Sequence, residues 1–449
     1  MNTLTWSNNI ISTVSRLAKQ TVPSTDMKQV ASLILSGGEG TRLHPLTLSR
    51  SKPAICFGGK YSLIDVPISN SLHCKCNKIF VLTQFLSSSL HHHIFQAYLQ
   101  GGKGDSIEIL TAEQKPSQKS WFQGTADAVR QNMNYLLESP VEYFLILSGD
   151  QLYNIDFCEM LRFAQKTDAD TVVAALPVSA ADAPRMGILK VDQRSFIKEF
   201  YEKPQDKELL ESLKSNPQTL EKAGVEPGSN RVYLGSMGIY LFKRQALIDL
   251  LTNDGREDFG KHLIPTQVAA GKAAAFIYDG YWEDIGTINS FYEANLALTD
   301  PNPLFNFHNE LRPIYTSRYD LPPAKFSNCQ LTQTILCEGS MIEADEITHS
   351  LLGPRSVVHK GSIIRDSYLM GNDFYCSSMK DNQGHFSNPQ IGENCIIKRA
   401  ILDKNVHLGK GVQLINKQKL THYDGGNVFI RDGIIIVPRG ASLPDGFIL

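Results

Sequence analysis

The chain has 449 residues, enough for two or three domains. Hydrophobic residues make up 42% and charged residues 20% of it, which is typical of a globular protein rather than a disordered or fibrous one. A formal net charge of −2 gives no excess of basic side chains for nucleic acid or an acidic membrane. No run approaches the roughly 18 consecutive apolar residues that span a bilayer, so we expect a cytoplasmic protein without nucleic-acid or membrane partners.

The first 25 residues contain no Asp or Glu and several Ser and Thr, as organelle-targeting segments do, but only one arginine. We expect a flexible tail over residues 1–27, in which Met27 is an alternative start. The eight cysteines include no pair with zinc or redox spacing, because Cys74 and Cys76 are separated by a single residue. The run from His91 to His93 also predicts no metal site, because consecutive helical side chains point in different directions.

Short apolar runs alternate with helical stretches from residue 28 to about 300. The strand-like runs are VASLIL (30–35), KIFVLT (78–83), YFLILS (143–148), TVVAAL (171–176) and AAAFIY (273–278). Amphipathic segments such as TADAVRQNMNYLLES lie between several of them. This alternation predicts an α/β domain over 28–300, with a mostly parallel sheet, helices on both faces, and ligands beyond the carboxyl ends of its strands.

A Pro-rich stretch without a clear period predicts a linker over residues 301–325. Beyond it, aliphatic residues recur mainly at steps of six, in the two runs Leu351, Val357, Ile363, Leu369 and Ile391, Ile397, Leu402, Leu408, Leu414. A six-residue period predicts a parallel β-helix over 326–449 whose repeated aliphatic residues point inward. The ends of such a coil can stack, so we also expect a homo-oligomer.

The stretch LILSGGEGTRLHPLT (33–47) places a glycine-rich turn directly after an apolar strand. It lacks the last glycine of GxGxxG and the lysine of the Walker loop. What remains is a turn whose backbone N–H groups can face phosphates, with Arg42 supplying a planar fork of donors. A plain β-turn is the alternative.

With SKPAICFGGKYSLIDVPISNS after it, this stretch resembles the sugar-1-phosphate nucleotidyltransferases, and among them the ADP-glucose pyrophosphorylases. The motifs WFQGTADAVRQN (121–132), LSGDQLY (147–153), FYEKP (200–204), GSMGIYLF (235–242) and YWEDIGT (281–287) follow in the family's order. The resemblance runs from residue 28 to 449. It implies a Rossmann-like, GT-A-like nucleotidyltransferase domain followed by a left-handed parallel β-helix.

The implied reaction joins ATP and glucose 1-phosphate into ADP-glucose and pyrophosphate. By this resemblance, Asp150 and Asp284 hold Mg²⁺, for which carboxylates are suitable ligands. Arg42 and Lys52 match residues that bind the triphosphate and the leaving pyrophosphate, so Arg42, Lys52 and Asp150 are the implied catalytic residues.

The resemblance also implies residues for each substrate. Those for glucose 1-phosphate are Phe122, Gly187, Glu202, Lys203 and Ser236. Those for the nucleotide are Gly37, Gly38, Gly40, Thr41, Gln84, Trp121 and Gly124.

Three positions depart from the family pattern. Gln151 stands where relatives commonly carry His, Phe122 where many have Tyr, and Gln123 where Arg is frequent. The aspartate of LSGDQLY is intact, so we expect an active enzyme with altered substrate affinity.

Arg50, Lys404 and Arg439 match positions at or near basic effector contacts, whereas Ser49 replaces a lysine of some bacterial relatives. The resemblance thus implies an anionic metabolite effector and a homotetramer, with solvated surface charges as the alternative. The ADP-glucose that the resemblance implies as product would feed α-glucan (glycogen or starch) synthesis. Two other functions remain open, namely a pyrophosphorylase for another nucleotide sugar and a non-catalytic regulatory subunit. An acyltransferase role for the β-helix is weaker, because His359 and His407 can simply face solvent.

Overall fold

The computed structural model describes residues 26–100, 102, 104, 106–113, 121–375 and 388–449. The tail expected over residues 1–27 therefore lies outside the described residues, apart from Asp26 and Met27. These two begin the 3₁₀ turn η1 (Asp26–Gln29), and Met27 is buried in the core.

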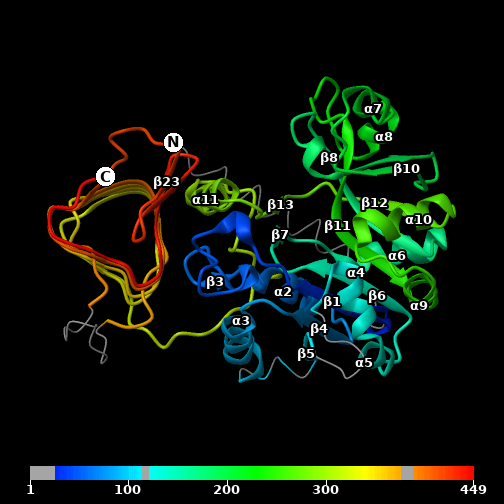
Figure 1. Ribbon diagram of the computed structural model, residues 1–449, viewed down its shortest axis with the longest axis horizontal. Helices are drawn as coiled ribbons and strands as arrows, with labels where there is room; N and C mark the ends of the chain where they lie inside the picture. The colour runs from blue at the N-terminus through cyan, green and yellow to red at the C-terminus, as the bar shows by residue number, and fades with distance from the viewer. Residues whose placement is uncertain (1–25, 101, 103, 105, 114–120, 376–387) are drawn as a thin grey trace, which may run out of the picture.

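A nine-stranded sheet forms the centre of the larger domain (Figure 1). Its strands are β1 (Val30–Ser36), β4 (Lys78–Thr83), β5 (Ile107–Thr111), β6 (Tyr143–Ser148), β8 (Thr171–Val178), β9 (Gly187–Val191), β10 (Ile197–Glu202), β11 (Tyr233–Lys243) and β12 (Ala273–Ile277). The order is β10-β9-β11-β6-β1-β4-β5, with β8 and β12 attached beside β11. Strands β6, β1, β4 and β5 run parallel, as expected from their almost continuous apolar sequences, and β11 pairs antiparallel with its neighbours.

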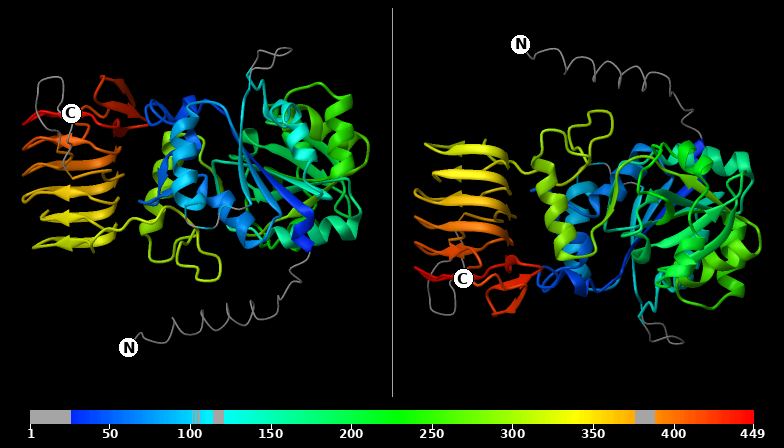
Figure 2. Two further views of the ribbon diagram at one scale, coloured as in Figure 1. Left: turned by 90° about the horizontal axis from the view of Figure 1, so that it is seen from below. Right: turned by 90° about the horizontal axis from the view of Figure 1, so that it is seen from above.

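Helices cover both faces of this sheet (Figures 1 and 2). The helices of the domain are α2 (Asp65–His73), α3 (Ser87–Ile94), α4 (Thr125–Gln131), α5 (Met133–Leu137), α6 (Phe157–Thr167), α7 (Lys207–Ser212), α8 (Pro217–Lys222), α9 (Arg244–Asn253), α10 (Ile264–Ala269) and, on the side of the β-helix, α11 (Ile288–Leu296). The segment TADAVRQNMNYLLES forms α4 and α5 rather than one helix. It breaks at Asn132, whose backbone leaves the helical region and whose side chain donates to the carbonyl of Ala128.

Short elements complete the larger domain and shape its site. They are the strands β2 (Cys56–Phe57), β3 (Tyr61–Ser62), β7 (Gln151–Tyr153) and β13 (Trp282–Asp284), and the turns η2 (Thr41–Leu43), η3 (Lys52–Ala54), η4 (Phe95–Leu99), η5 (Ala183–Arg185), η6 (Phe259–Leu263) and η7 (Ala297–Thr299). Antiparallel pairing of β7 with β13 sets Asp284 opposite Gln151, the residue after Asp150. Two segments far apart in the sequence thus meet at the edge of the sheet.

Residues 300–324, all of which the structure describes, form no helix or strand. The chain then enters a parallel β-helix made of β14 (Lys325–Phe326), β15 (Gln330–Leu336), β16 (Met341–Ile342), β17 (Glu346–Leu352), β18 (Val357–Val358), β19 (Ile363–Leu369), β20 (Ile396–Leu402), β21 (His407–Leu408), β22 (Gln413–Leu414), β23 (His422–Asp424), β24 (Phe429–Arg431), β25 (Ile434–Val437) and β26 (Ser442–Leu443). Successive coils stack in register, so that Leu352, Leu369, Leu402 and Val437 form one internal column.

The inward direction expected for the second aliphatic run is correct, as it is for Leu369 of the first run, but the other three members of the first run are shifted by one residue. Leu352, Val358 and Ile364 lie inside the coil, whereas their predecessors Leu351, Val357 and Ile363 do not. Neighbouring positions on a strand point to opposite faces, and both are aliphatic here, so the period alone could not choose between them.

An outer column on the same strands explains why both faces are apolar. Leu351, Tyr368, Ile401 and Ile436 stack in register and belong to the hydrophobic core of the sheet domain. Tyr292 of α11 adds a hydrogen bond from its hydroxyl to the carbonyl of Asp366, 2.6 Å away. The β-helix therefore packs lengthwise against the sheet domain, with α11 between them (Figures 1 and 2).

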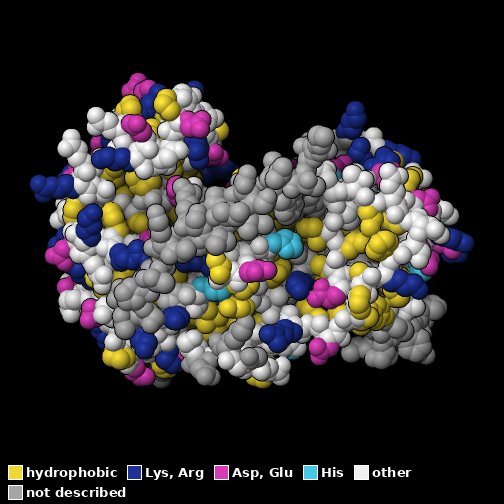
Figure 3. Space-filling view, turned by 180° about the vertical axis from the view of Figure 1, so that it is seen from behind, with side chains coloured by type: hydrophobic (Ala, Val, Ile, Leu, Met, Phe, Trp, Pro, Cys, Tyr) yellow, Lys and Arg dark blue, Asp and Glu magenta, His cyan; other side chains and the backbone are white. Residues whose placement is uncertain are grey.

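The surface carries acidic and basic side chains interspersed over both domains, as the view from behind shows (Figure 3). This mixture agrees with the near-zero net charge. In the part of the chain that the structure describes, no helix is both long and apolar enough to cross a bilayer.

Candidate active site

The glycine-rich loop (residues 37–52) leaves β1 at the carboxyl edge of the sheet. Gly40 adopts a left-handed conformation with φ of 65°, which favours glycine. A Cβ atom on Gly40 would lie 3.0 Å from the Cβ of Lys52, so glycine also lets the end of the loop approach its beginning. The chain then forms η2, which carries Arg42, and continues to η3, which begins at Lys52.

Lys52 lies between the two aspartates singled out in the sequence. Its Nζ forms an ion pair with Asp150 and lies 3.9 Å from Oδ1 of Asp284. The hydroxyl of Ser148 donates a second hydrogen bond to Asp150. The fold thus gathers one cation and two carboxylates from η3, the β6–β7 turn and β13.

The pKa values of the two carboxyl groups are shifted in opposite directions. Burial alone would raise the pKa of Asp150, but the charge and hydrogen bond of Lys52, with the Ser148 hydroxyl, hold it below its usual value. Burial and the negative charge of Asp150 raise the pKa of Asp284. Because one ammonium group neutralises only one of the two carboxylates, the pair can attract a further cation.

Two more cations face the same place. A Cβ atom on Gly286 would lie 3.2 Å from Asp284 and 3.4 Å from the guanidinium of Arg42, so these two side chains meet over a residue without one. The charges of Arg42 and Lys203 both act on the pKa of Asp284. The fold therefore brings together in one charged centre five residues that the sequence had singled out, namely Arg42, Lys52, Lys203, Asp150 and Asp284.

A cavity of about 560 Å³ opens on one side of this centre. Its lining includes Gly37, Gly38, Lys52, Gln84, Phe122, Gly124, Asp150 and Glu202. Gly40 and Thr41, which were expected at the nucleotide, are not among its lining residues.

Gln84 holds the segment that carries the WFQGTAD motif. Its Oε1 accepts from the backbone N–H of Phe122 at 2.6 Å. Gly124 is required by space, since a Cβ atom there would lie 2.4 Å from the backbone oxygen of Glu257. Trp121, expected to frame the base, is 60% exposed and does not line the cavity. Phe122, expected at the sugar phosphate, lines this cavity instead.

A second cavity of about 700 Å³ lies on the other side. It is lined by the predicted residues Arg42, Gly187, Glu202, Lys203, Ser236 and Asp284. Burial raises the pKa of Glu202, and Lys203 Nζ lies 3.7 Å from its Oε1. A Cβ atom on Gly187 would lie 2.8 Å from Oε2 of Glu202, so this glycine makes space for the carboxylate.

Gln151 lines both cavities, as do Glu202, Gly238 and Tyr240, and so forms part of the wall between them. Its Nε2 donates to the carbonyl of Met237 at 2.9 Å, and its Oε1 accepts from Nε1 of Trp282 at 3.3 Å. This buried amide therefore ties β7, β11 and β13 together beside the two aspartates. The sequence showed Gln151 only as a departure from the family pattern.

Other residues in the cleft were missed by sequence reasoning. Tyr240 lines both cavities, Asp258 lines the first, and Arg185 and Arg231 line the second. Tyr240 belongs to the quoted GSMGIYLF motif, which could have indicated it. The other three lie outside the motifs, and no sequence signal marks them.

Asp150 and Asp284 fit a magnesium ion chemically. They offer hard carboxylate oxygens from two elements, and both lie within reach of one ammonium group. Mg²⁺ commonly uses one or two protein carboxylates and takes its remaining ligands from phosphates and water.

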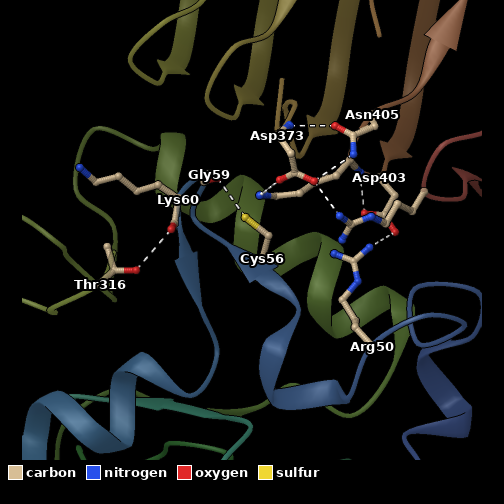
Figure 4. Close-up of polar contacts among 10 residues, drawn as sticks. Arg50, Cys56, Gly59, Lys60, Thr316, Asp373, Asp403 and Asn405 are labelled. Atoms are coloured by element: carbon tan, nitrogen blue, oxygen red, sulfur yellow. Dashed lines mark hydrogen bonds and ion pairs between the residues drawn. The ribbon is translucent and has the colours of Figure 1, made fainter. Parts of the chain in front are cut away.

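The three residues considered for an effector also come together, at a cavity of about 820 Å³ between the domains. Carboxylates engage their charges (Figure 4). Arg50 forms a buried ion pair with Asp403, and Asp373 lies 2.9 Å from Nζ of Lys404 and 2.6 Å from Nη2 of Arg439. The alternative expectation, that these cations are solvated surface charges, is wrong for Arg50, which is only 3% exposed.

No histidine or cysteine of the described residues lines the two cavities at the charged centre. His91 and His93 of α3 contact different partners, Thr83 and Asp65. Cys74 and Cys158 approach one another beside Asp156, although they are far apart in the sequence. Asp156 already caps α6 and forms an ion pair with Arg312 at 2.8 Å.

The fold and the cleft define an α/β domain with a charged cleft at the carboxyl ends of its strands, followed by a parallel β-helix domain. The family model described as nucleotidyl transferase matches residues 31–301, and the model described as GLGC left-handed parallel beta-helix domain matches residues 318–448. The chain therefore belongs to the nucleotidyl transferase family. Its two domains together have the architecture of the ADP-glucose pyrophosphorylase type.

Proposed function

We propose that this chain transfers the adenylyl group of ATP to α-D-glucose 1-phosphate, giving ADP-glucose and pyrophosphate. The observation that carries the proposal is the position of Lys52 between Asp150 and Asp284, where a cavity for each substrate adjoins the charged centre. The choice of adenine and glucose rests on the resemblance of the motifs to ADP-glucose pyrophosphorylases and on the matching β-helix domain.

In this reaction a phosphate oxygen of glucose 1-phosphate attacks the α-phosphorus of ATP. The new oxygen–phosphorus bond forms in line with the bond to the bridging oxygen, which breaks and releases pyrophosphate. We assign the first cavity, of about 560 Å³, to the nucleotide and the second, of about 700 Å³, to the sugar phosphate. Glu202 and Ser236 would orient the sugar, and Lys203 would bind its phosphate, so that the attacking oxygen faces the nucleotide cavity. The wall formed by Gln151 keeps the two substrates in adjoining halves of the cleft.

Charge neutralisation falls to the cations of the loop. Negative charge grows on the pyrophosphate as it leaves, and Arg42 and Lys52 are placed to stabilise it. Mg²⁺ bound by Asp150 and Asp284 would supply charge neutralisation at the reacting phosphates. Ser148 keeps the Asp150 carboxylate oriented through its hydroxyl hydrogen bond.

Pyrophosphate release tests the proposal. The purified full-length chain is assayed with Mg²⁺ and glucose 1-phosphate, with ATP, UTP, GTP or dTTP as the nucleotide, and Asp150→Asn serves as the inactive control. We expect release with ATP that is lost in the variant. Preference for another nucleotide would assign a different nucleotide sugar. No release with any of them, even with anionic metabolites added, would favour a regulatory subunit.

We also propose that the cavity between the domains binds an anionic metabolite and that the protein forms a homotetramer. Support for the first comes from Arg50, Lys404 and Arg439 around one cavity, where Asp373 occupies two of the cations. An Asp373→Asn variant should bind phosphorylated metabolites more tightly in calorimetry, because it frees Lys404 and Arg439. Unchanged affinity would contradict this. Sedimentation measures the oligomer directly.

A further inference from the structure

The β-helix touches the glycine-rich loop through a hairpin that departs from the regular coil. Strands β23 and β24 pair antiparallel, and β24 pairs antiparallel with β25, whereas the strands of the regular coils run parallel. This hairpin lies next to the segment that follows η2, as both views in Figure 2 show. The departure from the coil thus coincides with the contact to the loop.

The hairpin contact consists of three side chains. The rings of His44 and Phe429 meet edge to face with centroids 5.3 Å apart. Nη2 of Arg431 lies 3.4 Å from Nδ1 of His44, and the same guanidinium lies over the Phe429 ring. Because the Phe429 ring and the Arg431 guanidinium both contact the imidazole of His44, they restrict its position.

Arg431 is itself fixed by partners within the hairpin. Its guanidinium forms an ion pair with Asp424 and donates to the carbonyls of Tyr423, at 3.0 Å, and Ile430, at 2.9 Å. Phe429 is 8% exposed and packs in the core of the sheet domain. The hairpin therefore presents a rigid surface to His44.

His44 is two residues after Arg42 and closes the turn that carries it. The backbone N–H of His44 donates to the carbonyl of Thr41 at 3.1 Å, and that of Leu43 donates to Gly40 at 2.9 Å. A displacement of His44 would therefore move Arg42. At the other end of the loop, the buried pair of Arg50 and Asp403 holds the chain two residues before Lys52 (Figure 4).

We propose that Phe429 and Arg431 of the β-helix are positioning residues for the reaction, which act through His44 to hold Arg42 at the leaving phosphates. This inference rests on the proposed function, because it takes Arg42 to bind the triphosphate. It assigns the β-helix a part in the chemistry of the neighbouring domain. None of the hairpin's side chains lines either cavity, so the hairpin reaches the cleft only through the loop that carries Arg42, a residue of the second cavity.

The test compares Arg431→Gln and Phe429→Leu with Lys417→Gln in the full-length chain. Lys417 is an exposed cation of the same domain, so its variant controls for the loss of a charge. We expect KM for ATP, and for pyrophosphate in the reverse reaction, to rise about five-fold in the first two variants, and KM for glucose 1-phosphate, whose cavity Arg42 also lines, to rise less. Equal changes in both substrates, or values equal to those of the control, would overturn the inference.

Hydrogen exchange gives a readout that needs no activity. The amides of residues 41–47 should exchange faster in Arg431→Gln than in the wild-type chain, while those of β1 and β6 keep their rates. If the wild-type chain releases no pyrophosphate, the proposed function fails and the exchange data alone decide whether the hairpin holds the loop. Should Arg431→Gln not fold, Arg431→Lys, which keeps the charge but loses the fork, must show the same selective change; unchanged exchange there would refute the inference.

Discussion

The ammonium group of Lys52 forms an ion pair with Asp150 and lies 3.9 Å from Asp284. The charge of Lys52 therefore acts on both aspartates, although the three residues come from separate elements. In the proposed reaction, Lys52 would neutralise part of the negative charge that attracts Mg²⁺, and it would also stabilise the leaving pyrophosphate. These two roles have opposite consequences when the lysine is removed.

A Lys52→Gln variant should lower kcat about 100-fold, because one cation at the leaving group is lost. The same variant should reach half of its remaining activity at a lower Mg²⁺ concentration, because both aspartates lose their competing cation. A magnesium titration of the residual rate measures this. Lys78→Gln, which removes a lysine paired with Glu108 far from the cleft, is the control. If Lys52→Gln needed more Mg²⁺ than the wild-type chain, the competition between Lys52 and Mg²⁺ for the two aspartates would be contradicted.

The carboxylate of Glu202 predicts a pH dependence for sugar binding. Burial raises its pKa, so Glu202 takes up a proton at a higher pH than an ordinary glutamate. As the pH falls through this raised value, the acceptor for sugar hydroxyls is lost and KM for glucose 1-phosphate should rise. Glu202→Gln should have a high KM that lacks this component. Comparing the two profiles removes the titration of the substrate's own phosphate. Identical pH profiles would show that Glu202 does not bind the sugar as an anion.

Two glycines of the nucleotide cavity should respond differently to alanine. A Cβ atom on Gly124 would lie 2.4 Å from the backbone oxygen of Glu257, whereas one on Gly38 would meet nothing within 4 Å. Gly124→Ala should therefore lower the melting temperature and weaken ATP binding, because α4 must move away from Glu257. Gly38→Ala should keep the melting temperature of the wild-type chain. Equal thermal stability of the two variants would contradict the steric argument.

The buried pair of Arg50 and Asp403 should contribute strongly to the stability of the domain interface. Removing one partner leaves an uncompensated buried charge, so Arg50→Met should reduce the free energy of unfolding by about 3–5 kcal/mol. The exposed pair of Lys214 and Glu211 provides the comparison, and Lys214→Ala should leave the free energy of unfolding nearly unchanged. Urea unfolding measures both. A small effect of Arg50→Met would mean that water reaches this pair when Arg50 is replaced.

The sequence was sufficient for local features and for the charged centre. Apolar runs predicted β4 and β6 to the residue, because strands buried on both faces leave a continuous apolar signal. It could not choose between Leu351 and Leu352, because that side of the coil is covered by the other domain and is apolar on both faces.

Contacts between distant segments were the part that sequence reasoning could not supply. Nothing near Arg50 indicates that its guanidinium pairs with Asp403, and nothing near His44 points to Arg431. Trp121 shows the opposite limit, because its motif was recognised but its side chain lies outside the cavity. Motifs indicated which residues matter, and only the fold shows what each one contacts.

The most direct test of the central claim follows the reaction in reverse. Phosphorus NMR of the full-length chain with ADP-glucose, pyrophosphate and Mg²⁺ identifies each product by its own signals. We expect ATP and glucose 1-phosphate to form in equal amounts, and neither to form with Asp150→Asn. If the wild-type chain leaves ADP-glucose and pyrophosphate unchanged but converts another nucleotide sugar, or none, adenylyl transfer to glucose 1-phosphate is contradicted.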